Sequence, residues 1–304
     1  MTAEVAAVVP TLGAATLPAA LASLRLQGMA VDVTVVHQGD EALDEATAGL
    51  ADRVVSFPAP LGFAAAVNAG LAVRRARWSL LLNDDAELGA DFLATLLPAL
   101  HDSPWLAAVQ GVNRRETGGV VDGCGIGWNR WWQAVQLAEG QPPPGGDARG
   151  IFGVSAAAGL YRTSALDAVS LACGAFDREL DTYYEDVELA GRLRGAGYRA
   201  ALVPTAQAVH RGGGSAGAIG RRGQALLRGN RWLAAARLLG RQFPSVVPRL
   251  LLRDLLDAAR RPGRLPAIAA GWRRARRLLP VFAHLGPPQV PLNELRGLAA
   301  ERFA

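Results

Sequence analysis

The sequence predicts an α/β fold with a mostly parallel central sheet, followed by a basic helical segment. From residue 4 to about 112, short β-branched runs alternate with helical patterns, which is typical of a parallel sheet with helices on both faces. Half of the 304 residues are apolar, which suits a catalytic domain with an appendage and excludes wholesale disorder. Charge is unevenly divided: residues 1–210 hold 14 arginines and 23 acidic residues, whereas residues 211–304 hold 18 arginines and four acidic residues.

The first part of the chain is expected to supply alternating strands and helices. The expected strands are Val5–Pro10, Val31–His37, Arg53–Phe57, Trp78–Asn83 and Ala107–Val112. The helices expected between them are Leu17–Gln27, Ala42–Leu50, Phe63–Arg74 and Asp91–His101. Ligands of such sheets bind beyond the carboxyl ends of the strands. The polar residues that follow each strand are therefore the first place to look for a site.

The alternation stops after residue 112. Residues 113–150 combine a glycine-rich stretch, three tryptophans and a proline-rich loop, which predicts irregular or antiparallel chain with a mobile loop at 139–149. Regular structure is expected again in the helix Tyr184–Gly197 and the strands Ala200–Val203 and Ala206–His210. Three Arg-studded amphipathic helices are expected at about 219–241, 246–260 and 264–283.

This organisation predicts two units. Residues 1–215 would form the catalytic domain, with one half at 1–112 and the other at 113–215, and residues 216–304 an Arg-rich helical tail. The two cysteines have no metal-binding spacing, which excludes a structural zinc site and disfavours a disulfide framework. The N-terminus lacks a signal-peptide pattern, and no apolar run is long enough to span a bilayer. We therefore expect a cytoplasmic protein.

Acidic residues directly after an apolar strand form the first candidate site. Asn83, Asp84 and Asp85 follow the strand and would project into the ligand crevice, where carboxylates suit Mg²⁺ or Mn²⁺. The alternative is a solvated turn in which Asp85 caps the next helix. The residues alone leave both interpretations open.

Two further motifs are ambiguous when considered singly. Glu185 and Asp186 open a helix, where acidic residues favour the helix dipole, yet adjacent carboxylates beside two tyrosines also describe a general base in a cleft. His210 ends a strand and meets the glycine run that begins at Gly212, which would allow backbone to approach a ligand closely. A lone histidine is nevertheless more often a core or surface residue.

Several other nucleotide-binding and catalytic motifs are missing from the sequence. The chain contains no lysine, which excludes a P-loop, and it has no GxSxG nucleophile elbow. The glycine series from Gly123 to Gly127 lacks the preceding strand and following helix of a dinucleotide-binding loop. A sugar-1-phosphate nucleotidyltransferase would need a basic phosphate-gripping loop near residues 12–17, where no basic residue stands.

Taken in order, the motifs resemble family 2 of the inverting glycosyltransferases, which have the GT-A fold. The resemblance covers at least residues 4–235, and it implies that residues 1–112 are the nucleotide-binding half and residues 113–215 the acceptor half of the catalytic domain. It rests on Val8–Thr11, Val35–Gly39, Leu61–Ala64 with Asn68, Leu81–Asp85, Gly174–Asp177, Tyr184–Leu193, Gly197–Tyr198, Val203–Pro204, Val209–His210 and Gly229–Trp232. The whole-chain pattern is similar to rhamnosyltransferase-type members of the family.

The resemblance implies roles for individual residues. Asp85, with Asn83 less firmly placed, would bind a divalent ion, Mg²⁺ or Mn²⁺, that bridges the donor phosphates, and His210 would be a further ligand. Asp186 would be the general base and Glu185 would shape the acceptor pocket. The nucleotide would be contacted by Pro10, Thr11, His37, Gln38, Gly62, Asn68 and Asp84.

Some positions depart from the family pattern. Leu12 and Gly13 stand where the family usually has an aromatic residue, His37 stands where an aspartate commonly reads the base, and Asn83 replaces the first carboxylate of the metal motif. These departures leave the nucleobase open. dTDP-rhamnose is the first expectation for the donor, with a UDP-hexose as the alternative. A catalytically silent GT-A-like binding module is the alternative to an enzyme, although Asp85, Asp186 and His210 are all present.

The basic tail predicts contact with an acidic surface. Arginines and leucines interleave along residues 219–283, which suits an interfacial helix on anionic lipid and an acceptor that is a saccharide or a lipid-linked glycan. The protein would then lie on the inner face of the cell membrane. The alternative is packing of this segment on the catalytic domain. Nucleic acid is disfavoured because aromatic residues do not interleave with the arginines as a base-stacking platform requires.

Overall fold

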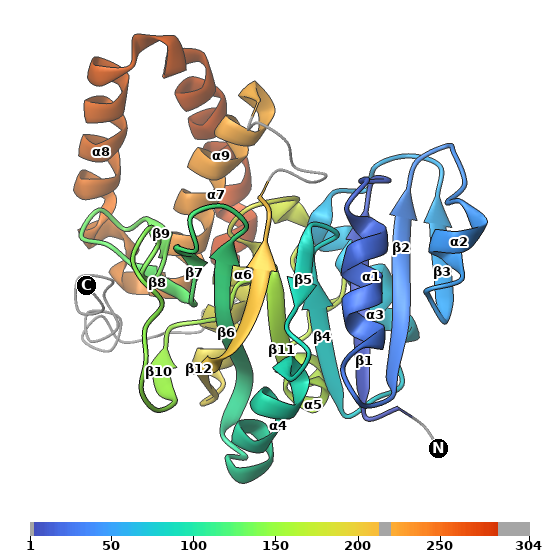
Figure 1. Cartoon of the computed structure of the whole chain (residues 1–304). Helices are drawn as coiled ribbons and strands as arrows, with labels where there is room; N and C mark the ends of the chain where they lie inside the picture. The colour runs from blue at the N-terminus through green and yellow to red at the C-terminus, as the bar shows by residue number, and fades with distance from the viewer. Residues whose placement is uncertain (1–2, 213–219, 285–304) are drawn as a thin grey trace.

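The computed structural model describes residues 3–212 and 220–284, and over these residues the chain forms a mixed sheet covered by helices, beside a helical hairpin (Figure 1). The strand order is β10-β12-β6-β11-β4-β1-β2-β3, with β5 paired to β12 and β7 paired to β6. The glycines at 213 and 214, the boundary at 215/216 and residues 285–304 of the expected tail lie outside the described residues.

The parallel half of the sheet follows the predicted order. Alternate side chains of the first strand enter two cores: Val5 and Val9 pack with the helix α1 on one face, whereas Val8 packs with α3 on the other. The predicted second helix is much shorter than expected, because Asp44 accepts a hydrogen bond from the Thr47 amide and starts the helix only at Glu45. The elements are β1 (Val5–Thr11), α1 (Leu17–Arg25), β2 (Val31–Gln38), α2 (Glu45–Ala48), β3 (Arg53–Phe57), α3 (Phe63–Val73) and β4 (Trp78–Leu82).

The remaining part of the sheet differs from the prediction in two ways. Asp85 does not cap a helix, because the short strand β5 follows it directly and pairs antiparallel with β12. The two strands expected at 200–210 are one continuous strand, whose register against β6 shifts between Leu202 and Gln207. The pairing of Ala86 with His210 places that histidine beside Asp85. The elements are β5 (Ala86–Leu88), α4 (Phe92–Asp102), β6 (Leu106–Arg115), β11 (Ala158–Arg162), α5 (Thr163–Ala168) and β12 (Arg199–His210).

The segment between β6 and β11 is antiparallel, as predicted. Trp128 and Trp132 are buried against Phe152 and Tyr184, so these indoles are core residues. The short strands are β7 (Val121–Gly123), β8 (Ile126–Trp128), β9 (Ala134–Gln136) and β10 (Arg149–Ile151). After β11 come the turn η1 (Arg178–Leu180) and the helix α6 (Glu185–Gly195), which confirms the helix expected there.

The C-terminal helices form where the sequence predicts them. They are α7 (Arg221–Leu239), η2 (Gly240–Ser245), α8 (Val247–Arg260), η3 (Pro262–Arg264) and α9 (Leu265–His284). In Figure 1, α8 and α9 stand apart as a hairpin, with α7 between them and the sheet. No helix in residues 3–212 and 220–284 combines the length and hydrophobicity needed to cross a membrane.

The interpretation of residues 219–241 as a membrane-surface helix is wrong for α7. Its apolar residues Trp232 and Leu238 are buried in a core shared with the catalytic domain. Its basic residues are buried as well: Arg231 pairs with Asp254 at 2.9 Å, and Arg237 pairs with Asp177 at 2.8 Å. Because Arg231 and Arg237 each have a buried carboxylate partner inside the protein, their charges are not available to anionic lipid. Packing on the catalytic domain, the alternative interpretation, describes α7.

Candidate active site

Residues at the carboxyl ends of β1 and β2 line a cavity of about 270 Å³, which we call the donor cavity. Pro10 and Thr11 form one wall. The Thr11 hydroxyl donates to Asp84 Oδ2 at 2.6 Å and accepts from the Gly13 amide at 3.0 Å. This buried contact fixes the loop after β1 against the loop after β4. Asp84 therefore organises the cavity from behind, where it is only 3% exposed.

The opposite wall of the donor cavity depends on close backbone approach. Gln38 Oε1 accepts a hydrogen bond from the Leu61 amide at 2.7 Å, which holds the loop before α3. Gly62 has φ +89°, and a Cβ at this position would lie 2.1 Å from Asp181 Oδ1. Only glycine fits both the conformation and the space. Asp181 in turn pairs with Arg222 at 2.6 Å, so a cation from α7 lines the cavity.

Three of the predicted nucleotide contacts, Asp84, His37 and Asn68, are not among the residues that line the donor cavity. Asp84 contacts the cavity wall through Thr11, and His37 is only 4% exposed. The Asn68 amide donates to the carbonyl oxygens of Cys173 and Phe176 at 2.8 and 2.7 Å and accepts from the Phe176 amide at 2.9 Å. Contrary to the expectation, Asn68 therefore holds the 173–176 loop in this structure instead of facing the donor cavity.

A second cavity, of about 300 Å³, brings together the predicted catalytic and metal-binding residues, and we call it the catalytic cavity. Glu185 and Asp186 enter it from the start of α6, whereas His210 enters from the end of β12 and Asn83 from the end of β4. It shares a wall with the donor cavity, formed by Phe63, Thr182 and Tyr183. The structure therefore places a carboxylate pair and a histidine in a cavity that adjoins the donor cavity.

His210 lies between two aspartates. Its Nε2 is 3.2 Å from Asp85 Oδ1, and its Nδ1 is 2.7 Å from Asp122 Oδ2. Burial lowers the pKa of His210, but the hydrogen bonds and charges of Asp122 and Asp85 outweigh burial and raise it to about 9. The histidine is therefore protonated at neutral pH and bridges the two carboxylates. A divalent cation bound at Asp85 would take the place of that proton.

The residues around His210 fit a divalent ion that also has ligands from a nucleotide. In the described part of the chain, no three or more His, Cys, Asp or Glu side chains gather as a complete metal site. Asp85 and His210 supply two ligands, and Asn83 Oδ1 is a buried oxygen with no hydrogen-bond partner in the structure. Oxygen and imidazole ligands suit Mn²⁺ and Mg²⁺, and Mg²⁺ in particular is usually held by one or two carboxylates plus substrate phosphates.

Asp122 is a candidate site residue that the sequence analysis missed. It hydrogen-bonds to His210 Nδ1, while His210 Nε2 lies beside Asp85, which is the way carboxylates orient metal-bound histidines. We expect Asp122→Asn to weaken Mn²⁺ binding roughly 10- to 100-fold, since outer-shell changes at metal sites have effects of this size. Titration of Mn²⁺ followed by its electron paramagnetic resonance signal measures this without turnover. Arg115→Gln removes the cation that lies 3.5 Å from Asp122 and also pairs with Glu139; it is the matched control and should change the affinity far less.

Both carboxyl groups of the catalytic cavity have raised pKa values. Burial, and then the charge of Asp186, raise the pKa of Glu185 well above its usual range, and its Oε2 has no hydrogen-bond partner. Burial raises the pKa of Asp186 to about 6, opposed by backbone hydrogen bonds from Val187 and Ala156. Asp186 is therefore mostly ionised at neutral pH and can accept a proton, while the surroundings of Glu185 favour its neutral form.

The loop before α6 is held in an unusual conformation by the tail. Asp181, Tyr183 and Tyr184 all have positive φ, at 60°, 71° and 71°. Non-glycine residues rarely adopt this conformation, and clusters of them are typical of functional sites. Asn230 of α7 donates to the carbonyl oxygens of Leu180, Thr182 and Tyr183 at 2.6, 3.1 and 2.8 Å. The tail thus shapes the wall between the two cavities.

Comparison with known proteins places this arrangement in a family. The sequence matches the model described as Glycosyl transferase family 2 over residues 6–166, more than half of the chain. The chain belongs to glycosyl transferase family 2. This family membership and the sheet topology confirm the GT-A fold that the motifs predict. No curated protein sequence matches the chain.

Solved structures resemble this family 2 chain at low sequence identity. Residues 1–349 of Staphylococcus aureus TarS align with a TM-score of 0.55 and 14% identity, over 100% of this chain and 89% of TarS 1–349. The mannosyltransferase PcManGT from Pyrobaculum calidifontis, in complex with GDP-Man and Mn²⁺, aligns with a TM-score of 0.50 and 18% identity, over 94% of this chain and 84% of its own. GalNAc-T7 with UDP, GalNAc and Mn²⁺ aligns with a TM-score of 0.57 and 12% identity, over 80% of this chain and 49% of its own.

These identities show the shared fold alone. The family 2 match includes Asp84 and Asp85 but ends before Glu185, Asp186 and His210. The interpretation of those three residues therefore depends on the geometry of the catalytic cavity. Asp122 lies within the matched segment but outside any motif that the sequence analysis recognised. Arg222 and Asn230 lie beyond the match, and the only signal for Asn230 is its place in the family-like stretch Gly229–Trp232.

Proposed function

We propose that the chain transfers a sugar from a nucleotide-diphosphate donor to an acceptor hydroxyl, with inversion and with Mg²⁺ or Mn²⁺. The observation that carries the proposal is the arrangement of two pairs at one cavity: Asp85 with His210, and Glu185 with Asp186. The catalytic cavity and the donor cavity share a wall, so a donor and an acceptor fit side by side. Three structural neighbours carry nucleotides or nucleotide sugars in their described complexes, which supports the donor class.

The residues that line the two cavities can carry out the transfer as a single displacement at the anomeric carbon. The acceptor hydroxyl attacks the anomeric carbon while the bond from that carbon to the diphosphate oxygen breaks, and Asp186 accepts the hydroxyl proton. Glu185 lines the same cavity, where burial and the charge of Asp186 raise its pKa and favour its neutral form. Arg222 places positive charge beside the donor cavity, where the diphosphate would leave. The divalent ion, when bound, neutralises the charge that develops on the leaving diphosphate.

The rate of transfer should depend on the ionisation of Asp186. Because its pKa is raised to about 6, the carboxylate becomes protonated within an accessible pH range. A protonated base cannot accept the hydroxyl proton, so we expect kcat to fall about tenfold per pH unit below pH 6 and to level off above it. A pH–rate profile at saturating donor, acceptor and Mn²⁺ measures this. A profile that stays flat from pH 7 to pH 5 would contradict the assignment of the base.

A basic pocket beside the catalytic cavity supports an acceptor with negative charge. This pocket, of about 230 Å³, shares Ala134, Tyr184 and Leu227 with the catalytic cavity. Four arginines and two aspartates line it, namely Arg228, Arg231, Arg253, Arg264, Asp254 and Asp257. The excess of two positive charges lies near the base and suits a negatively charged group on the glycan of the acceptor. We propose a lipid-linked glycan as that acceptor, with the protein acting in the cytoplasm at the inner face of the membrane.

The donor is tested directly by calorimetry. We propose dTDP-rhamnose first, with a UDP-hexose as the alternative. Purified protein is titrated with UDP, dTDP and GDP, each with and without Mn²⁺. Binding of one nucleotide that depends on Mn²⁺ is the expected result and identifies the donor class. Absence of binding by all three in the presence of Mn²⁺ would instead favour a silent binding module with the same fold.

A further inference from the structure

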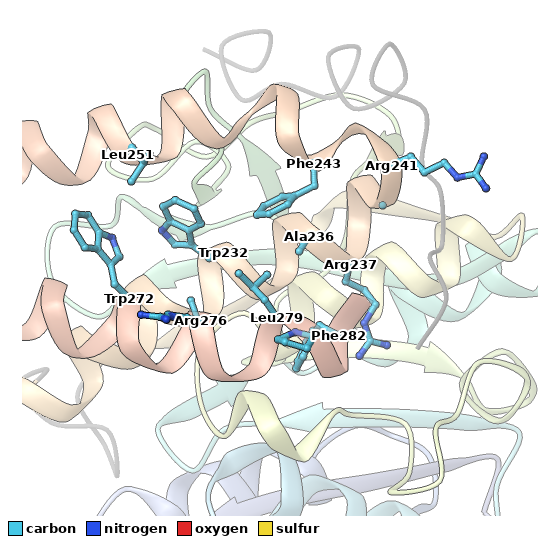
Figure 2. Close-up of a pocket in the computed structure, with 13 residues that line it drawn as sticks. Trp232, Ala236, Arg237, Arg241, Phe243, Leu251, Trp272, Arg276, Leu279 and Phe282 are labelled. Carbon is cyan, nitrogen blue, oxygen red and sulfur yellow. The ribbon is translucent and has the colours of Figure 1, made fainter. Parts of the chain in front are cut away.

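The C-terminal helices enclose a cavity that the proposed chemistry does not use. It has a volume of about 890 Å³ and lies between α7, η2, α8 and α9. Within the described residues, none of its lining side chains belongs to the donor or the catalytic cavity. Figure 2 shows aromatic and aliphatic side chains from all four elements around it. We call it the tail groove.

The walls of the tail groove are apolar. Trp232 and Phe243 pack edge to face with ring centroids 6.3 Å apart. The indole N–H groups of Trp232 and Trp272 both donate to Asp254 Oδ2, at 3.1 and 2.8 Å. Their polar atoms are thereby used within the protein, and the carbon faces of the rings remain for the groove. Further apolar lining comes from Ala236, Leu251, Ala275, Leu279, Pro280 and Phe282.

All of the ionisable side chains that line the tail groove are positive. Arg237 pairs with Asp177 and Glu188, and its guanidinium lies 4.7 Å from the centroid of the Phe282 ring, so it forms part of the wall. Arg276 is exposed and lies beside Trp272 at the edge of the groove (Figure 2). Within residues 239–284 there are ten arginines and two aspartates. Both aspartates are buried in contacts with tryptophan or arginine side chains, so they do not offset the positive edge.

The apolar walls continue onto exposed surface. Leu251 is 38% exposed and lines the groove, while its neighbours Leu252 and Leu255 on α8 are 47% and 56% exposed. Exposed leucines beside arginines are the composition of a surface that meets anionic lipid. The groove therefore opens beside a helix surface that combines exposed leucines with arginines.

We propose that the tail groove binds the hydrocarbon chain of a long-chain lipid phosphate, with the phosphate beside Arg276. The volume lies within the roughly 300–1,000 Å³ of small-molecule sites, and the charge complements an anionic head group. The occupant is the lipid part of the acceptor, and in this respect the inference rests on the proposed function. The groove then holds the lipid on the same helices that border the basic pocket next to the catalytic cavity.

Calorimetric titration of the full chain with dodecyl phosphate, below its micelle concentration, tests the proposal. Dodecanol and inorganic phosphate are the matched probes: dodecanol keeps the hydrocarbon chain without the phosphate, and inorganic phosphate keeps the charge without the chain. We expect saturable binding of one dodecyl phosphate per chain, weaker binding of dodecanol and no binding of inorganic phosphate in the groove. Decyl phosphate should bind about tenfold more weakly, since it buries two fewer methylenes.

Two pairs of variants locate the site. Leu251→Trp fills the groove and should weaken binding at least tenfold, while Leu252→Trp on the neighbouring exposed position should leave it unchanged. Arg276→Gln should weaken dodecyl phosphate about fivefold but leave dodecanol unaffected, and Arg277→Gln, which does not line the groove, is its control. Mn²⁺-dependent nucleotide binding is measured on each variant and should not change. If the parent protein bound no nucleotide, the proposed transferase function would be refuted. The lipid titrations would still show whether the tail groove binds a lipid phosphate.

Three results would overturn the proposal. The first is absence of saturable dodecyl phosphate binding by the full chain. The second is binding to phosphatidylglycerol vesicles alone, which would make the surface a general membrane contact. The third is binding only by a variant that ends at His284, which would mean that residues 285–304 occupy the groove.

Discussion

Asp186→Asn is expected to lower kcat for sugar transfer by about 100- to 10,000-fold, the usual contribution of a general base. The change replaces the ionised carboxylate that accepts the acceptor proton with a neutral amide of nearly the same shape. Asp186 lines the catalytic cavity but not the donor cavity, so Mn²⁺-dependent nucleotide binding should stay within about twofold of the parent. Single-turnover transfer assays and calorimetry measure the two quantities separately.

Glu185→Gln is the matched control for Asp186→Asn. Burial and the charge of Asp186 raise the pKa of Glu185 and favour its neutral form, which a glutamine amide imitates in size and charge. We therefore expect its kcat to fall much less than that of Asp186→Asn. A parental rate in Asp186→Asn, or an equal loss in both variants, would contradict the division of roles between the two carboxyl groups.

Burial of the Asp186 carboxylate should also lower the stability of the folded protein at neutral pH. The folded state raises the pKa of Asp186 from 3.8 to about 6, so it binds the proton more tightly than the unfolded chain does. Stability contributed at Asp186 is therefore lost as the pH rises from about 4 to 6, and above pH 6 the ionised group destabilises the fold. The asparagine variant carries no such charge, and its Tm at pH 7 should equal or exceed that of the parent. A loss of activity with unchanged or higher Tm separates catalysis from misfolding.

Local sequence patterns predict the parallel half of the fold well. The alternation of β-branched runs and helical patterns places β1 to β4 and α1, α3 and α4 within a few residues, because each buries an apolar face of its own. The tail helices follow for the same reason. The shortening of α2 is a local effect of Asp44, whose side chain starts the helix later than the apolar pattern suggests.

Long-range pairing decides what the sequence could not predict. His210 lies beside Asp85 because β5 pairs with β12, a contact between strands about 120 residues apart that has no local signal. Asp122 joins them for a similar reason, since β7 pairs with β6, next to β12. Asn68 lies in a motif that resembles the family's, yet its amide holds a loop more than 100 residues later in the chain. Motifs thus indicate which residues are candidates for a site, while strand pairing determines which of these side chains come into contact.

The tail shows why composition alone misleads about partners. Eighteen arginines suggest a surface for anionic lipid, but α7 uses Arg231 and Arg237 in buried ion pairs. Asn230, directly before Arg231, holds the loop that separates the donor and catalytic cavities. α7 is therefore packed into the part of the protein that contains the two cavities. Exposed positive charge with apolar neighbours remains on α8 and α9, the helices that border the tail groove.

Asp85→Ala is expected to remove the metal dependence of donor binding. Asp85 is a direct ligand candidate, so its loss should weaken Mn²⁺ more than the roughly 10- to 100-fold expected for an outer-shell change such as Asp122→Asn. Nucleotide affinity with Mn²⁺ should then fall to the value measured without it, because no ion remains to bridge protein and diphosphate. Calorimetry of the nucleotide with and without Mn²⁺ gives this difference directly.

Asp91→Ala, an exposed aspartate six residues further along the chain whose side chain makes no capping hydrogen bond, is the control for Asp85→Ala and should behave like the parent. Metal-dependent nucleotide binding that survives in Asp85→Ala would refute this ligand. The order of effects carries further information: a loss in Asp85→Ala that exceeds that in Asp122→Asn supports a metal held by Asp85 and His210. Equal losses would mean that the three side chains act only as a buried ion-pair network, in which any member is as important as another.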